Sequence, residues 1–250
     1  MGVIRSSGFR KICIGETALL VSTLAFVPVM FMASIIISAS DGFDNFIFSN
    51  DVVYIMLSGA AFLSFLIIFS GVVECGADCK SMRRAKLFII IQLIMSVISI
   101  LFEGVDIDYY FSNSPIILTN WIIGLFDSIT SAAHFLSSFL GILYLLGGFR
   151  EAWYICGGDE ETNKSITSLQ LQYAVNTSIL VMVFLTIVTL VLFAFYRPNP
   201  SELVISASKW ATVCGLPAIF ILAVWKIVIH IRIVRMSWLV TRTIAEISGG

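Results

Sequence analysis

Residues 120–141 read NWIIGLFDSITSAAHFLSSFLG, and this stretch decides the predicted fold. Its polar and small residues recur at alternating spacings of four and three, so on an α-helix they form one stripe roughly 100° wide. We call this stripe the polar seam. It comprises Asn120, Gly124, Asp127, Ser131, His134, Ser138 and Gly141. The residues between them are mostly apolar, and as a helix the stretch measures about 30 Å, the thickness of a bilayer core. A polar stripe at that depth must face protein or water, so we expect the other helices to gather around it.

The whole chain has the composition of a polytopic membrane protein. Of its 250 residues, 58% are hydrophobic and 12% are charged, and the mean hydropathy is +0.98. A soluble domain carries about 25% charged residues. We predict an all-α fold with six transmembrane helices at residues 17–40, 52–73, 87–102, 115–146, 173–196 and 204–229. Residues 17–231 thus form a membrane domain between a short N-terminal segment (1–16) and a basic tail (232–250), and its longest loop covers residues 147–172.

The distribution of basic residues predicts the orientation of these spans. Thirteen of the 15 lysines and arginines fall on one side of the predicted topology, together with both termini, and only Arg197 and Lys209 fall on the other. Cytoplasmic loops carry such an excess of Lys and Arg. Both termini are therefore predicted to be cytosolic. The inner basic surface is predicted to contain Lys80, Arg83, Arg84, Lys86, Arg232, Arg235 and Arg242.

The polar seam supports two interpretations. Asp127 and His134 lie seven residues apart on one face, and ionisable residues in mid-bilayer are functional candidates. They could form a proton or cation relay, bridged by neighbouring hydroxyls or water. Alternatively the glycines and serines let helices approach closely, and the seam packs helices together. We favour packing, within one protomer or between protomers. The second span has a similar small-residue patch at residues 58–61 and Ser64.

The N-terminus and the cysteines suggest lipidation. Met1-Gly2 followed by Ser6 matches the myristoylation pattern at Gly2, and Cys13 beside the first span could be palmitoylated. Cys75 and Cys79 are spaced as two potential zinc ligands, with Cys156 as the only further candidate on that side. Zinc needs four ligands, so we interpret these cysteines as reduced thiols and predict no metal and no cofactor.

No sequence motif supports catalysis. The chain contains no Gly-rich phosphate loop, HExxH or GxSxG pattern. We therefore predict that the protein is not an enzyme, and we expect no nucleic-acid partner.

Six spans, short loops, cytosolic termini and the Met1-Gly2 start with Cys13 together resemble one group of proteins. These are the glideosome-associated proteins with multiple membrane spans of apicomplexan parasites. The resemblance covers the whole chain at the level of architecture, and residues 147–154, GGFREAWY, are its most distinctive run. It implies a scaffold of the inner membrane complex that oligomerises through its spans. Its cytosolic side would bind cytoskeletal or motor-complex proteins.

The sequence thus predicts an integral membrane scaffold or anchor that contacts membrane lipids and recruits cytosolic partners through its basic loops and tail. The alternative is a small channel or a proton- or cation-linked transporter that uses Asp127 and His134.

Overall fold

The computed structural model describes residues 6–39, 50–104, 116–196 and 202–248. Within these ranges the chain forms six helices and no strand, which confirms the predicted all-α class. The helices are α1 (Ser6–Ala39), α2 (Asn50–Cys75), α3 (Lys80–Gly104), α5 (Ile116–Ile155), α6 (Glu160–Tyr196) and α7 (Glu202–Ser248). Three of them contain segments long and apolar enough to cross a membrane: Ile129–Ile155, Glu160–Val191 and Ile205–Ile247. A shorter apolar segment, Gly59–Cys75, lies in α2. The described helices therefore fit a membrane-embedded protein.

The helices extend far beyond the predicted spans at one end of the molecule. The prediction of a loop over residues 147–172 was wrong, because α5 continues to Ile155 and α6 begins at Glu160. Gly157, with φ of +74°, ends α5, and the Gly158 N–H donates to the Trp153 carbonyl over 2.9 Å, as in a Schellman motif. Residues 6–16 and 232–248, which flank the predicted membrane domain, belong to α1 and α7.

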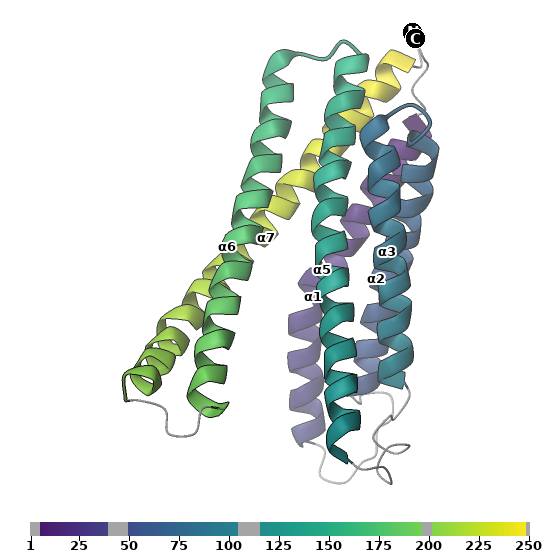
Figure 1. Ribbon diagram of the computed structural model, residues 1–250. Coiled ribbons are helices and arrows are strands. Elements are labelled where there is room, and N and C mark those ends of the chain that lie inside the picture. The colour runs from purple at the N-terminus through teal and green to yellow at the C-terminus, as the bar shows by residue number, and fades with distance from the viewer. Residues whose placement is uncertain (1–5, 40–49, 105–115, 197–201, 249–250) are drawn as a thin grey trace.

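The six helices pair as antiparallel neighbours: α1 with α2, α3 with α5, and α6 with α7. Figure 1 shows that α1 begins and α7 ends at the same end of the bundle, where the α2–α3 and α5–α6 turns also lie. We call this the basic end, because it contains Lys80, Arg83, Arg150 and Arg242. Toward the opposite end the α6–α7 pair diverges from the other four helices (Figure 1).

The best-packed core lies at the basic end, and all six helices contribute to it. We call it the basic-end core. It includes Phe9, Ile12, Val72, Met82, Phe149, Trp153, Ile166, Val240 and Ile244. Most of these positions lie outside the predicted spans, which explains why the helices continue there. Each helix carries apolar side chains beyond its span. Their burial from water stabilises the folded state by about 25 cal/mol per Å² of apolar surface.

Helices α1 and α2 touch through their backbones. A Cβ built on Gly71 would lie 2.5 Å from the Gly8 carbonyl oxygen, and one built on Gly15 would lie 2.9 Å from the Ser64 carbonyl oxygen. Ser64 belongs to the small-residue patch predicted on the second span, whereas Gly59 of the same patch has open space around it. The close contact between α1 and α2 therefore lies near the basic end, where Lys11 of α1 also pairs with Glu74 of α2.

Candidate functional site

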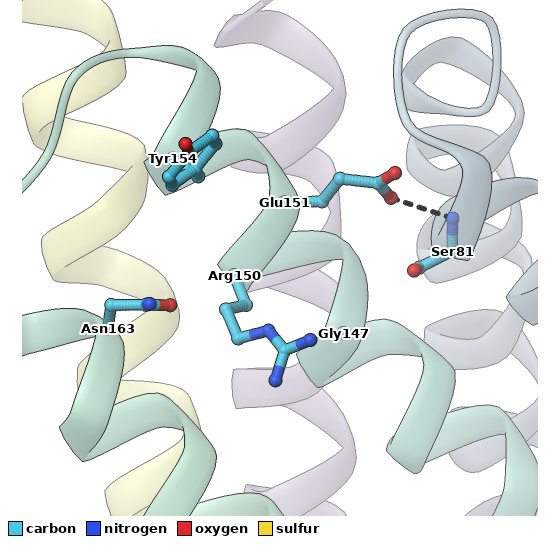
Figure 2. A pocket seen from close by; sticks show the side chains of 6 residues that line it. All are labelled: Ser81, Gly147, Arg150, Glu151, Tyr154 and Asn163. Carbon is cyan, nitrogen blue, oxygen red and sulfur yellow. Dashed lines mark hydrogen bonds between the residues drawn. The ribbon is translucent and has the colours of Figure 1, made fainter. Parts of the chain in front are cut away.

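A cavity of about 350 Å³ opens at the basic end between α3, α5 and α6. We call it the α5 pocket, because most of its lining belongs to the distinctive run at residues 147–154. It is lined by Ser81, Gly147, Arg150, Glu151, Tyr154 and Asn163. Figure 2 shows Arg150 and Asn163 on either side of it, with Tyr154 nearer the end of α5.

The helical period of α5 explains how this run builds both core and pocket. Phe149, Ala152 and Trp153 are buried in the basic-end core, with exposed fractions of 5% or less. Their intervening neighbours must then point away from that core. Tyr154 is accordingly 78% exposed, and the Arg150 side chain is also exposed. The buried residues thus fix the pocket residues on a rigid helix.

Glu151 ties the pocket to the start of α3. Its Oε2 accepts a hydrogen bond from the Ser81 N–H over 2.8 Å, drawn as the dashed line in Figure 2. The first N–H groups of a helix have no partner within the helix, and a carboxylate there also interacts favourably with the helix dipole. Glu151 therefore holds α5 against α3, and Arg150 is the one cation among the residues that line the pocket.

The α5 pocket has unused hydrogen-bonding capacity. The Asn163 Oδ1 is buried and accepts no hydrogen bond from any described residue, which is costly unless a ligand or water supplies a donor. Arg150 contributes a cation with several N–H donors. Together these groups suit a ligand that offers a donor to Asn163 and an anionic or carbonyl oxygen to Arg150. A segment of polypeptide with an acidic side chain has both.

The turn between α5 and α6 is held by Asp159 and Trp153. The Asp159 Oδ2 accepts the Thr162 N–H over 2.7 Å and caps α6, and this bond lowers the pKa of the Asp159 carboxyl. The Trp153 Nε1 donates to the Asp159 carbonyl over 3.0 Å. Asp159 in the α5–α6 turn is thus hydrogen-bonded to Trp153 of α5 and to Thr162 of α6.

The described part of the polar seam lies partly against α3. The His134 Nε2 is 3.3 Å from the Ser96 Oγ of α3, and Gly141 faces Phe88 and Ile89 of the same helix. Ser138 is half-buried, whereas Ser131 is exposed. Asn120, Gly124 and Asp127 belong to α5, but their side-chain surroundings are not among those that the structure describes. The structure therefore does not place the predicted pair of Asp127 and His134.

A buried contact between two ionisable side chains, which sequence reasoning missed, joins α1 to α7. The Glu16 Oε2 lies 3.1 Å from the His230 Nε2, and neither atom has a well-formed hydrogen bond to any described residue. One turn before His230, the Lys226 Nζ lies 5.8 Å from the centre of the Phe135 ring and 6.0 Å from that of Tyr173. Glu16 and His230 each directly adjoin a predicted span in sequence. The one sequence signal for this contact was that each of the two ionisable residues stands at the end of an apolar run.

The residues predicted to form the inner basic surface fall into two groups. Lys80, Arg83 and Arg84 are exposed and Lys86 is half-buried at the start of α3. The Arg84 guanidinium lies 5.8 Å from the centre of the Tyr144 ring. Arg232, Arg235 and Arg242 are exposed along the last turns of α7.

Cys13, Cys75 and Cys79 are buried rather than presented to solvent, whereas Cys156 is half-buried. The Cys13 Sγ lies 3.1 Å from the Thr241 Oγ1, so palmitoyl transfer to it would require local opening. Burial raises the pKa of the Cys13 and Cys75 thiols and raises that of Cys79 to about 12. The described residues hold no group of three His, Cys, Asp or Glu side chains arranged for a metal. Gly2 lies outside the described residues.

Comparison with family models, with curated proteins and with solved structures found no match to this chain. The class that the structure itself defines is an all-helical membrane protein with a packed basic end.

Proposed function

We propose that the protein is an integral membrane scaffold that links a membrane to a cytosolic assembly through its basic end. In this proposal the chain crosses the membrane six times, both termini are cytosolic, and the molecule oligomerises through its spans. The observation that carries the proposal is the basic-end core. A core built mostly outside the predicted spans forms a rigid platform on the membrane, which suits a surface for partners.

The α5 pocket is the proposed partner site on this platform. It is open and lies on a rigid helix, and its Arg150 and Asn163 offer the two complementary contacts described above. An acidic segment of a cytoskeletal or motor-complex protein has the required chemistry. Under the resemblance drawn from the sequence, the membrane would be the inner membrane complex.

The proposal can be tested by lateral diffusion. A fluorescent fusion in its native cells should diffuse slowly, because a tethered scaffold is held by its partners. Arg150→Ala with Tyr154→Ala should increase its mobility severalfold. Lys164→Ala is the matched control, because Lys164 is an exposed cation of α6, 74% exposed and paired with Glu160, that does not line the pocket. Free diffusion of the unmodified protein, or no difference between the variants, would refute the proposed tether.

A small proton- or cation-linked transporter is the second candidate. The buried pair of Glu16 and His230 favours it, because ionisable groups enclosed among apolar helices often mark ion paths. His134 remains a candidate beside Ser96. Reconstituted protein should then show ion flux that Asp127→Asn with His134→Gln abolishes. Both replacements still form hydrogen bonds, so a scaffold would assemble and localise normally. Flux that is absent from the unmodified protein, or unchanged in the variant, removes this candidate.

A further inference from the structure

A second cavity at the basic end lies between α6 and α7 and has a volume of about 530 Å³. We call it the arginine pocket. Its cationic wall is formed by Arg232, Arg235 and Arg242. Trp238, Leu169 and Leu239 supply its apolar wall. The pocket thus combines a strongly basic side with an apolar side, unlike the α5 pocket.

The three guanidinium groups retain free donors. The Arg232 Nη1 donates to the Gln172 Oε1 over 2.8 Å, and the Arg242 Nε donates to the Glu246 Oε1 over 2.9 Å. Arg235 forms no ion pair with any described residue. A guanidinium carries five N–H donors, so most of this capacity is open to a ligand. Three arginines face one carboxylate here, and the pocket carries a net positive charge.

The pocket lies at the depth expected of lipid headgroups. The Trp238 Nε1 donates to the Thr17 Oγ1 over 3.1 Å, and Thr17 is the first residue of the first predicted span. Tryptophan is enriched at this level of membrane proteins because its ring is apolar and its N–H is polar. Leu169 is buried and Leu239 is 48% exposed. Leu169 lies four residues before the predicted span at 173–196, so on the α6 side the apolar wall borders that span.

We propose that the arginine pocket binds the headgroup of an anionic phospholipid from the leaflet that borders the basic end. Arginine recognises phosphate oxygens through paired N–H···O bonds, and basic pockets between membrane helices bind anionic headgroups. The apolar wall favours a lipid over an acidic peptide, because a lipid brings acyl chains to the same place. This inference rests on the proposed placement of the basic end at the membrane surface, but it requires no scaffold partner.

The test uses the purified full-length chain in a neutral detergent. Thermophoresis should show dioctanoyl phosphatidic acid binding about tenfold more tightly than dioctanoyl phosphatidylcholine. The triple variant Arg232→Gln, Arg235→Gln, Arg242→Gln should lose about tenfold in affinity for the phosphatidic acid. The matched variant Lys80→Gln, Arg83→Gln, Arg84→Gln removes three charges from the same end and should retain the unmodified affinity. Equal melting temperatures of the two variants establish that both are folded. Arg235→Gln alone, which breaks no ion pair among the described residues, should also weaken binding.

Four outcomes would overturn the proposal. Equal affinity for the two lipids would show that charge is not recognised. An equal loss in both triple variants would indicate a diffuse electrostatic field rather than a pocket. Displacement of the lipid by an equal concentration of inorganic phosphate would identify a free-anion site. Binding of a glutamate-rich peptide with the same arginine dependence, without lipid binding, would identify a protein partner. Because no scaffold partner is present, failure here is distinct from failure of the diffusion test.

Discussion

The contact between α1 and α2 predicts a large effect of one methyl group at Gly71. A Cβ at this position would lie 2.5 Å from the Gly8 carbonyl oxygen and 2.9 Å from the Ile12 backbone N, whereas ordinary contact begins at 3.4 Å. Both close atoms belong to the backbone and cannot rotate away. The two helices must therefore separate locally by about 0.9 Å, the difference between 3.4 and 2.5 Å, to accept Gly71→Ala.

Overpacking of this kind costs about 1–3 kcal/mol, and the rigid backbone contacts place Gly71→Ala in the upper part of that range. Alanine recovers about 1 kcal/mol because it favours a helix over glycine. We therefore expect Gly71→Ala to lower the free energy of unfolding by about 1–2 kcal/mol. Gly59→Ala on the same helix is the matched control, because nothing lies within 4 Å of its added Cβ. It should be neutral or stabilising.

A fluorogenic thiol reagent can follow this unfolding in detergent. Cys13, Cys75 and Cys79 are buried in the basic-end core and become reactive only when it opens. Cys156 and Cys214, which are more exposed, would be replaced by serine. The melting midpoint of Gly71→Ala should fall by roughly 4 °C relative to the parent. If Gly71→Ala melts together with Gly59→Ala, the helices do not touch as described and the reasoning fails.

Three further predictions concern other contacts of the basic end. Glu16→Ala should lower stability by about 1–3 kcal/mol in the same melt, because it leaves the buried His230 ring without its polar neighbour. Glu16→Leu with His230→Leu should recover much of the loss, and a double variant as unstable as the single one would contradict this. The pKa of the Asp159 carboxyl is lowered by its bond from Thr162, so its cap on α6 stabilises at neutral pH and is lost as the pH falls below the ordinary carboxyl value. Relative to the intrinsic exchange rate at each pH, protection of the first-turn amides of α6 should fall at low pH and in Asp159→Ala, and identical protection in the two proteins would argue against the cap. With a pKa of about 12, Cys79 should be about 0.01% thiolate at pH 8 and react slowly with iodoacetamide until the pH is raised. Alkylation as fast as that of free cysteine would show that Cys79 is open to solvent.

The sequence predicts the fold class because the apolar runs are long and nearly free of charge. The helices over residues 52–73, 87–102 and 173–196 were therefore expected, and the structure contains α2, α3 and α6 across them. The extension of α5 and α6 into residues 147–172 was not expected. Arg150, Glu151 and Asp159–Glu161 make that stretch read as a polar loop, whereas burial of Phe149, Trp153 and Ile166 keeps it helical.

The candidate sites were less predictable, because they depend on contacts between distant segments. The basic residues of both pockets were visible in the sequence, but Asn163 joins Arg150 only through the α5–α6 turn. Glu16 and His230 lie more than 200 residues apart in the chain, so no spacing links them. Nothing in the sequence marks Gly8 and Gly71 as contact residues, because their contact exists only where α1 packs against α2.

Because most of the basic-end core lies outside the predicted spans, its side chains are buried from water rather than from lipid. Apolar burial is a driving force only for surface that would otherwise face water, because lipid chains are as apolar as leucine. Under the proposed cytosolic placement of the basic end, urea added to intact membranes should act on this core and leave the spans in their hydrocarbon. The slope of stability against urea reports the surface exposed on unfolding. This slope should therefore be as small as that of a small domain, and smaller than expected for the complete unfolding of 250 residues.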